Sequence, residues 1–398
     1  MKKIFSLSIL TLTLAILSLG CGDEKDCCAM PAALFITDLL QIEGNSSTAV
    51  EVSVSLVAAV DEEITVHFST ESYEATAGED FAETHGTLTF PPGETTKKLQ
   101  VQILGDTLRE ADERFFVKLS DPVNAELSEA SAFVTLRNDD TFFEIPDEGY
   151  ATPETYDGYD LQWSDEFKGK NVNTSDWTYD LGDGCPNNCG WGNNELESYT
   201  NRLENVFLTQ GKLVIEARKE SYGGKQYTST RMKTQGLKEF QYGRIDIRAK
   251  LPVGKGVWPA LWMLGSDITS VGWPACGEID IMEYLGHDPD LTYGTGHWGT
   301  SSHHYVGDSI HSVGKNYNEA FHVFSILWEQ DKLTWLMDDQ PFFELTPAVT
   351  GVGEWAFNHP FFFIFNVAVG GNWPGNPDGT TTFPQRMIVD YVRVFKKQ

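Results

Sequence analysis

The sequence predicts an all-β protein made of two β-sandwich domains, and three observations support this fold class. Residues 32–140 alternate apolar and polar side chains over short segments that turn residues separate. From residue 159 onward the alternation returns, aromatic residues become dense and few helical patterns occur. At 398 residues, the chain also exceeds what a single hydrophobic core usually organises.

The composition is that of folded domains with an acidic surface. Hydrophobic residues make up 41% of the chain and charged residues 22%, which argues against a disordered or a fibrous protein. The formal net charge of −29 repels phosphate groups and anionic lipid headgroups. We therefore expect no nucleic-acid partner, and an uncharged polysaccharide fits the charge better. We also expect a monomer.

The first 20 residues are typical of an export signal, because two lysines precede an apolar run that is too short for an ordinary membrane anchor. Residues 17–21 resemble a bacterial lipoprotein processing site, with Ser18 in place of the usual leucine. This resemblance implies that Cys21 carries lipid. The acidic tether 21–31 resembles a surface-export signal, so we expect an exported lipoprotein exposed on the outer membrane. Simple secretion is the alternative.

Residues 32–140 carry the detailed pattern of a β-sandwich, with apolar side chains at every second position of segments such as 50–56. Motifs at residues 77–81 and 86–93 resemble those of a Calx-beta domain. The resemblance implies calcium binding, since hard oxygen ligands from separate loops suit this ion. The implied ligands are Glu43, Asp80, Asp106, Glu110, Asp139 and Asp140. The alternative is that these acids only cap turns.

Residues 141–158 contain prolines, a glycine and scattered acids, and we interpret them as a linker. The alternating pattern of residues 159–398 predicts one large antiparallel sandwich, a concanavalin-like β-jelly roll. Within it, the apolar run 361–369 is predicted to be a buried strand. We expect the domain at 32–140 to act as a spacer for the larger one.

The segment 278–283 holds three acidic residues. On a regular strand, Glu278 and Asp280 point to one face, whereas Glu283 points to the other. A β-bulge near residues 281–282 would bring Glu283 back to the first face. Three acids on one surface repel each other and lose hydration, so a cleft that performs chemistry explains them better than a core does.

Paired carboxyl groups suit the hydrolysis of a glycosidic bond, because one attacks as the anion while the other donates a proton. Neighbouring carboxyls raise each other's proton affinity, which keeps one protonated near neutral pH. A separation of roughly 5–5.5 Å leads to retention of configuration and one of roughly 6.5–9.5 Å to inversion. The residue pattern alone leaves this separation open.

Residues 273–286 resemble the signature of glycoside hydrolase family 16, in the bulge-containing form of laminarinases, and the resemblance extends over residues 160–397. It implies a retaining endo-β-1,3-glucanase that needs no cofactor for catalysis. In this family the first glutamate is the nucleophile, the aspartate assists it and the second glutamate is the acid/base. These roles fall on Glu278, Asp280 and Glu283.

Other functions remain open at this stage. A sugar-binding or adhesive jelly roll that lacks catalysis is one alternative. The same machinery acting on a mixed-linkage glucan or a marine galactan is another, and transglycosylation in place of hydrolysis is a third.

The family resemblance also implies residues that contact sugar. Pyranose rings present C–H groups that pack on an indole, while the indole N–H can bond a hydroxyl. The implied contacts are Asn194, Arg231, Trp258, Trp273, His297 and Trp373. We interpret Trp262 and Trp335 as packing residues, and an ordinary loop histidine is the alternative for His297. His303 and His304 are disfavoured as a metal pair, because adjacent side chains on a strand diverge.

Cys185 and Cys189 close a small loop and are the best candidates for a disulfide in an exported chain. A zinc site is disfavoured, because no second cysteine pair or histidine cluster accompanies them. Cys276 is expected to be a buried thiol.

The family resemblance further implies a structural calcium ion on the face away from the cleft. Its ligands would be the backbone around Glu166, the carbonyl of Gly211 and the side chain of Asp390.

Overall fold

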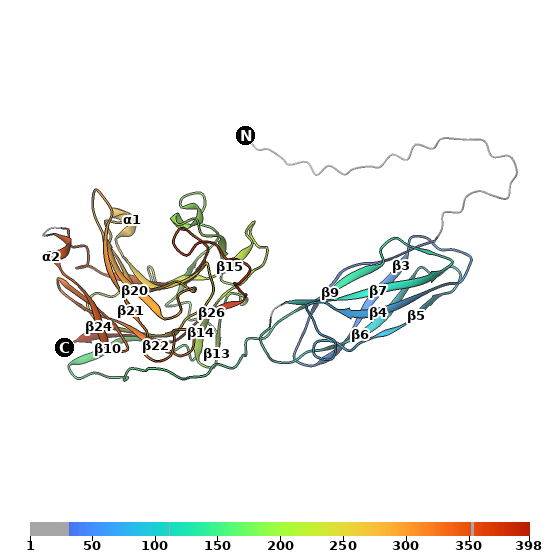
Figure 1. Ribbon diagram of the computed structural model, residues 1–398, viewed down its shortest axis with the longest axis horizontal. Coiled ribbons are helices and arrows are strands. Elements are labelled where there is room, and N and C mark those ends of the chain that lie inside the picture. Colours follow the sequence, from blue (N-terminus) through green and yellow to red (C-terminus); the bar gives the residue numbers. More distant parts are fainter. Residues whose placement is uncertain (1–31, 111, 352–353) are drawn as a thin grey trace. The chain divides into compact units, whose positions relative to one another are not determined.

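The computed structural model describes residues 32–110, 112–351 and 354–398, and nearly all of their regular structure is β-strand (Figure 1). The predicted all-β class is confirmed. Within these residues, no helix is long and apolar enough to cross a membrane. The predicted export signal, the tether 21–31 and Cys21 lie outside the described residues.

The chain divides into two compact units. The first holds residues 32–106 and 112–139, and the second holds residues 107–111 and 140–398. The predicted domain boundaries are therefore wrong at two places. The short segment 107–111 belongs with the second unit, and so does the stretch that was predicted to be a linker.

The first unit is the predicted β-sandwich. Its four-stranded sheet has the order β6 (Thr96–Leu104), β3 (Ser47–Leu56), β1 (Ala33–Ile36) and β8 (Glu126–Leu127). Its five-stranded sheet has the order β2 (Leu39–Ile42), β9 (Ser131–Arg137), β7 (Glu113–Val123), β4 (Ile64–Ser72) and β5 (His85–Phe90). Alternate residues of both sheets are buried in a shared apolar core, in which Phe81 and Phe115 stack with ring centroids 4.0 Å apart.

The second unit is the larger sandwich, the predicted jelly roll. One sheet has the order β13 (Val206–Thr209), β14 (Lys212–Ala217), β26 (Gln385–Lys397), β17 (Gly243–Lys250), β22 (His322–Glu329), β23 (Lys332–Met337) and β24 (Gln340–Leu345), and β10 (Tyr159–Asp165) also pairs with β26. The other has the order β11 (Thr178–Asp180), β16 (Arg231–Lys233), β25 (Phe361–Val369), β18 (Val257–Gly265), β19 (Glu278–Tyr284), β20 (Leu291–Trp298) and β21 (His304–His311). The remaining elements are β12 (Glu197–Tyr199), β15 (Tyr227–Ser229), the 3-10 helix η1 (Cys189–Gly192) and the short helices α1 (Ile268–Val271) and α2 (Pro347–Thr350).

Strand β25 is buried along its whole length, which confirms the prediction for residues 361–369. Phe363 and Phe365 face the large core between the two sheets of the second unit. On the opposite face of the strand, Ile364 packs in a smaller cluster with Cys276. A strand that is covered on both faces needs no polar alternation, which explains the continuous apolar run.

Residues 141–158 pack along the second unit instead of forming a free linker. Ile145 is buried against Phe321 in a small apolar cluster. The backbone N–H of Thr152 donates to the hydroxyl of Tyr391 at 2.8 Å. The prediction of a linker was wrong because a few apolar and hydrogen-bonding side chains, spread among polar ones, are enough to hold an extended segment on a sheet.

Arg109 explains why segment 107–111 belongs to the second unit. Its guanidinium donates to both carboxylate oxygens of Glu216 at 3.1 Å and lies 4.1 Å from the ring centroid of Phe207. Glu216 is fully buried and also accepts a hydrogen bond from Arg386 at 2.7 Å. A buried carboxylate is stable only with such partners. Arg109 therefore stabilises the second unit by neutralising Glu216.

Two glycines of β20 make room beneath the strand that carries the acidic residues. The indole of Trp335, fully buried, donates to the backbone carbonyl of Asp280 at 2.7 Å. A Cβ atom on Gly294 would lie 2.4 Å from this indole, and one on Gly296 would lie 2.6 Å from the side chain of Leu345. The small residues therefore let a large aromatic support the acidic strand from below.

We predict that Gly294→Ala lowers the free energy of unfolding by about 1–3 kcal/mol, because the added methyl group overpacks the core against Trp335. Urea denaturation of the full chain measures this. The matched control is Gly379→Ala, where a Cβ meets no atom within 4 Å. Equal stabilities of the two variants would contradict the packing role of Trp335.

Candidate active site

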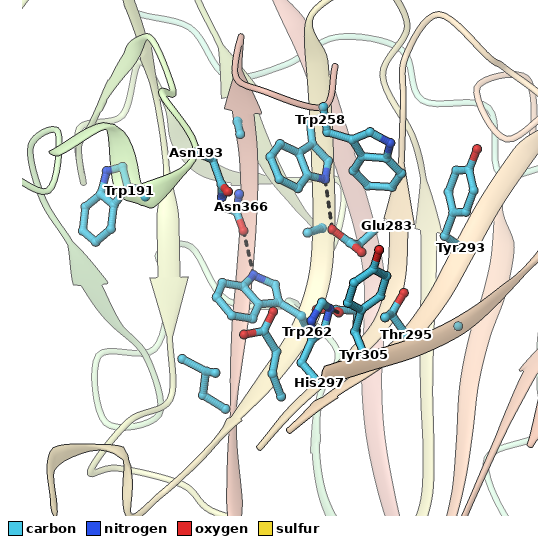
Figure 2. Close-up of a pocket in the computed structure, with 18 of the residues that line it drawn as sticks. Trp191, Asn193, Trp258, Trp262, Glu283, Tyr293, Thr295, His297, Tyr305 and Asn366 are labelled. Carbon is cyan, nitrogen blue, oxygen red and sulfur yellow. Dashed lines mark hydrogen bonds and ion pairs between the residues drawn. The ribbon is translucent and has the colours of Figure 1, made fainter. Parts of the chain in front are cut away.

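The seven-stranded sheet of the second unit carries a cleft with a volume of about 1030 Å³. Its lining side chains come from strands β16, β18, β19, β20, β21 and β25, and Figure 2 shows many of them around the cleft. Strand alternation selects them. On β20, Tyr293, Thr295 and His297 line the cleft, whereas the intervening Gly294 faces Trp335.

Strand β19 contains the predicted β-bulge. Asp280 pairs with Thr295 and Glu283 pairs with Tyr293, so three steps along β19 match two steps along β20. The register against β18 shifts at the same place. As a result, Glu278, Asp280 and Glu283 all line the cleft, with Asp280 buried and both glutamates half-buried.

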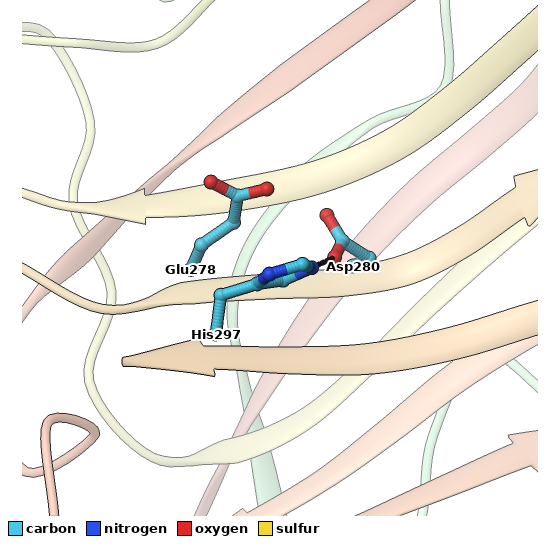
Figure 3. A group of neighbouring side chains, drawn as sticks. All are labelled: Glu278, Asp280 and His297. Carbon is cyan, nitrogen blue, oxygen red and sulfur yellow. Dashed lines mark ion pairs between the residues drawn. The ribbon is translucent and has the colours of Figure 1, made fainter. Parts of the chain in front are cut away.

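Each acidic side chain has one ring nitrogen beside it. The indole Nε1 of Trp273 donates to Glu278 Oε2 at 2.7 Å, and that of Trp258 donates to Glu283 Oε1 at 3.2 Å. The imidazole Nε2 of His297 lies 2.9 Å from Asp280 Oδ2, and Figure 3 shows this pair beside Glu278. These contacts orient the three carboxyl groups into the cleft.

Beside these acids, polar side chains on one wall of the cleft are oriented by a chain of hydrogen bonds from Trp262 to Glu195. Trp262 donates to the Asn366 side-chain oxygen at 2.8 Å (Figure 2). Asn366 in turn donates to the hydroxyl of Tyr199 at 3.1 Å, and this hydroxyl donates to Glu195 at 3.0 Å. Trp262, Asn366 and Glu195 all line the cleft. Trp262 also packs against a small buried cluster with Cys276, as predicted, so it serves both the core and the cleft wall.

Glu197 lies beneath this wall and is fully buried. Its carboxyl group accepts a hydrogen bond from the backbone N–H of Val369 at 2.7 Å. Burial, followed by the nearby carboxyl of Glu195, raises the pKa of Glu197 well above its ordinary value. The hydrogen bond to Val369 ties β12 to β25.

Comparison with known proteins identifies the fold that carries this cleft. The profile of the glycosyl hydrolases family 16 matches residues 188–393. The chain belongs to this family. The Calx-beta domain profile matches residues 35–140, which confirms the resemblance of the first unit.

Three family 16 relatives illustrate the similarity. The laminarinase catalytic domain from Thermotoga maritima MSB8 is 49% identical, and the match covers 61% of this chain and 100% of that one with a TM-score of 0.57. A beta-glucanase from Rhodothermus marinus is 41% identical over 253 residues, 60% of this chain and 85% of that protein. Glucan endo-1,3-beta-glucosidase A1 from Niallia circulans is 39% identical over 270 residues, 63% of this chain but only 40% of that protein.

Burial sets the protonation of the three carboxyl groups in the family 16 cleft. Burial and the adjacent Asp280 raise the pKa of Glu278 to about 8. Burial raises the pKa of Asp280 to about 8, and burial together with Asp280 raises the pKa of Glu283 well above its ordinary value. The three carboxyl groups are therefore partly protonated at neutral pH. A site that needs one ionised and one protonated carboxyl requires such raised pKa values.

Most of the predicted sugar-contacting residues line the cleft, namely Arg231, Trp258, Trp273, His297 and Trp373. Asn194 does not. It has a φ of 60° in a turn, and its side chain donates to Asn372 at 2.8 Å. The neighbouring Asn193 lines the cleft, and the sugar contact of Asn194 stays a prediction.

Several cleft residues were missed from the sequence, namely Trp191, Asn193, Glu195, Tyr293, Thr295, His303, Tyr305 and Asn366. Two signals could have found some of them. Asn366 is the single polar residue of an otherwise apolar strand, and Thr295 and Tyr293 lie two and four positions before His297 on the same strand face. Arg231 stacks 4.6 Å from the ring of Trp191, which is how this tryptophan reaches the cleft wall.

The cysteine and histidine predictions agree with the structure. A disulfide joins Cys185 and Cys189, and Cys276 is a buried free thiol whose pKa burial raises to about 12. The side chains of His303 and His304 diverge, since His303 contacts Trp273 in the cleft while His304 lies against Trp298.

Of the calcium ligands implied for the second unit, the side chain of Asp390 does not fit a calcium ion. The two carboxylate oxygens of Asp390 accept hydrogen bonds from Lys212 at 2.8 Å and from Arg248 at 2.7 Å. Bound cationic side chains neutralise the oxygens that the metal would need.

The first unit favours the turn-capping alternative over calcium. Asp80 accepts a hydrogen bond from the backbone N–H of Thr76 at 2.6 Å, and Asp139 accepts one from Gly44 at 2.9 Å. Among residues 32–110, 112–351 and 354–398, three potential metal-binding side chains come within 4.8 Å of one another only in the cleft.

That cleft group consists of Glu278, Asp280 and His297 (Figure 3). Three oxygen and nitrogen donors at this spacing could hold a metal ion. However, metal ligands must be deprotonated, whereas both carboxyls of this group have raised pKa values. The arrangement favours proton chemistry over metal binding.

We predict that replacing Asp280 by asparagine makes stability less dependent on pH. The folded state retains the Asp280 proton up to about pH 8, whereas the unfolded state releases it near its ordinary pKa. Stability of the wild type therefore falls as pH rises between these values, by at most about 1.4 kcal/mol per pH unit for one group.

Urea denaturation at several pH values between 5 and 8 measures this effect. The free energy of unfolding of Asp280→Asn should rise relative to the wild type across the series. Asp308→Asn, at an exposed position of β21, serves as the control. A difference between Asp280→Asn and the wild type that stays constant with pH would contradict the raised pKa.

Proposed function

We propose that the protein is a retaining endo-β-1,3-glucanase of the laminarinase type. The observation that carries the proposal is the bulge in β19, which turns Glu278, Asp280 and Glu283 toward one cleft. Two carboxyl groups that flank a glycosidic bond, one ionised to attack and one protonated to donate, are the requirement for this hydrolysis. The similarity to a beta-glucanase from Rhodothermus marinus and a glucan endo-1,3-beta-glucosidase from Niallia circulans supports a β-glucan substrate.

In the proposed reaction, ionised Glu278 attacks the anomeric carbon and Glu283 donates its proton to the departing oxygen. Glu283 then removes a proton from water, which attacks the same carbon and releases Glu278. Asp280 lies beside Glu278 and shares its proton, so that Glu278 can be ionised while the group as a whole stays partly protonated.

The cleft walls suit a neutral glucan. Trp273 is 50% exposed and Trp373 is 41% exposed, and both line the cleft. Exposed indole faces offer packing surfaces for pyranose rings. The polar wall of Asn193, Glu195 and Asn366 supplies hydrogen-bonding groups for sugar hydroxyls.

Azide rescue tests the two glutamate roles. We predict that Glu278→Gly does not hydrolyse laminarin, but with an activated aryl β-laminaribioside it forms the α-glycosyl azide, because azide takes the place of the nucleophile. Glu283→Ala should form the β-glycosyl azide, because azide then replaces water at the glycosyl-enzyme intermediate. Its turnover of laminarin should fall by roughly 10²–10⁴-fold.

The control for these variants is Glu344→Gln on β24, which changes an exposed carboxyl that does not line the cleft and should keep most of the activity. The same azide anomer from both glutamate variants would refute the assigned roles. A wild-type protein that binds laminarin but releases no reducing sugar would favour the sugar-binding alternative.

We further propose that the protein is an outer-membrane lipoprotein exposed on the cell surface, with the Calx-beta unit as a spacer. The apolar run, the processing-site pattern and the acidic tether in residues 1–31 support this. Lipid on Cys21 with several acyl chains would be sufficient for stable anchoring.

We predict that Cys21→Ala moves the protein from the membrane fraction to the soluble fraction and abolishes incorporation of labelled fatty acid. Activity per molecule on soluble laminarin should not change, because the cleft lies entirely within the second unit. Retention of the label in this variant would exclude Cys21 as the lipidated residue.

A further inference from the structure

The second unit has a pocket besides the cleft, with a volume of about 380 Å³. Its lining residues come from β11, which is the edge strand of the seven-stranded sheet, and from the turn before β11, the turn after β16 and the loop after β12. Among the described residues, none lines both the pocket and the cleft. Pockets of roughly 300–1,000 Å³ accommodate small molecules. This pocket therefore has room for a ligand that the cleft does not hold.

Two tight turns hold the walls of the pocket in place. Before β11, the backbone N–H of Trp177 donates to the carbonyl of Asn173 at 3.0 Å, and the Trp177 side chain is buried in the large core. After β16, the backbone N–H of Leu237 donates to the carbonyl of Thr234 at 2.9 Å. The buried Thr234 hydroxyl accepts a hydrogen bond from the backbone N–H of Phe363 at 3.0 Å. Both turns are thus attached to the core, so the pocket is formed before a ligand arrives.

The side chains that line the pocket are uncharged. Three carry hydroxyl groups, two carry amide groups, and an indole and a leucine supply apolar surface, namely Thr174, Thr178, Tyr179, Asn201, Gln235, Trp177 and Leu237. The nearby carboxylate of Asp176 is neutralised by Lys238, whose Nζ lies 3.2 Å away. In a chain with a net charge of −29, such a lining attracts neither cations nor anions strongly. It suits a neutral ligand.

The polar groups of the lining are available to that ligand. Within the described part of the chain, no hydrogen bond is made by the amides of Asn201 and Gln235 or by the hydroxyls of Thr174, Thr178 and Tyr179. Burial alone raises the pKa of Tyr179 to about 12, so no neighbouring charge acts on its hydroxyl. An amide offers two donors and an acceptor, and a hydroxyl both donates and accepts. These groups match the hydroxyls of a sugar, which also donate and accept.

Apolar surface accompanies these polar groups. The side chain of Leu237 is 41% exposed, and that of Tyr179 is half-buried. Sugar rings present C–H groups that pack on apolar and aromatic side chains, while their hydroxyls pair with polar ones. The lining therefore meets both requirements of a neutral sugar.

We propose that this pocket is a secondary, non-catalytic binding site for glucosyl units of the polysaccharide substrate. The inference rests on the proposed function, because the identity of the sugar comes from the substrate of the cleft. The pocket holds a segment of a glucan chain beside the cleft and takes no part in bond cleavage.

Strand β11 connects the pocket with the cleft. Thr178 lines the pocket, and Asp180 lies two positions farther along the same strand face, about 7 Å away at ~3.3 Å per residue. Asp180 accepts a hydrogen bond at 3.1 Å from Arg231, which lines the cleft. A long glucan that occupies the pocket is therefore held at high local concentration near the cleft. A short oligosaccharide that fills only the cleft gains nothing from the pocket.

Kinetics on long and short substrates test this role. The double variant Asn201→Ala/Gln235→Ala removes both amides at positions that are exposed or half-buried. We expect its KM for laminarin to rise by about 3–10-fold, because hydrogen bonds to the chain are lost, whereas kcat should not change. The kcat/KM for laminaritetraose should equal that of the wild type. The matched control is Gln340→Ala, an exposed amide on β24 that lines neither the pocket nor the cleft.

The outcomes separate the pocket from the cleft and from the proposed function. A wild-type KM for laminarin in the double variant would overturn the inference. An equal rise in KM for laminaritetraose would also overturn it, because that pattern marks damage to the cleft. A wild-type protein without hydrolytic activity on either substrate would instead refute the proposed function.

Binding can also be observed with the pocket intact. The Glu278→Gln protein lacks the attacking carboxylate and leaves the ligand uncleaved. On titration with laminaritetraose, the side-chain amide NMR signals of Asn201 and Gln235, assigned through the two single alanine variants, should shift and saturate. Amide signals that stay unchanged while signals of cleft residues shift would exclude a sugar site in the pocket.

Discussion

The site depends on one irregularity in β19. A regular strand would direct Glu278 and Glu283 to opposite faces, because side chains alternate. The extra residue between Asp280 and Glu283 restores both glutamates to the cleft face. Everything else at the site follows from this placement, since the carboxyls share one buried space and compete for protons there.

Placing three acids on one strand requires support from the rest of the sheet. From below, Trp335 bonds the backbone of Asp280 and occupies the space left by Gly294 and Gly296. Beside the acids, Trp258 and Trp273 donate to the two glutamates. These contacts offset part of the cost of burying carboxyl groups, and protonation offsets the remainder.

Much of this arrangement could be predicted from the sequence, because it depends on local patterns. The alternating segments indicated the two sandwiches, and the spacing of acids in 278–283 indicated the bulge. Other features depend on distant contacts. Asn194 is bonded to Asn372, far along the chain, and Asp390 is occupied by Lys212 and Arg248 from two other strands.

Contacts between distant parts of the chain also explain why the domain boundaries and the place of His303 were not predicted. Nothing local marks Arg109 as the partner of the buried Glu216, and polar composition hid the packing of residues 141–158. His303 lies in a loop, so its contact with His297 becomes visible only when β20 and β21 are paired.

The central claim is that Glu278 and Glu283 converge on a single glycosidic bond. Proton NMR of the first products from laminarin, recorded before mutarotation, tests it most directly. Convergence within roughly 5–5.5 Å predicts that the β-anomer appears first and the α-anomer grows later. Initial release of the α-anomer would contradict the account, because inversion needs carboxyls that stand farther apart.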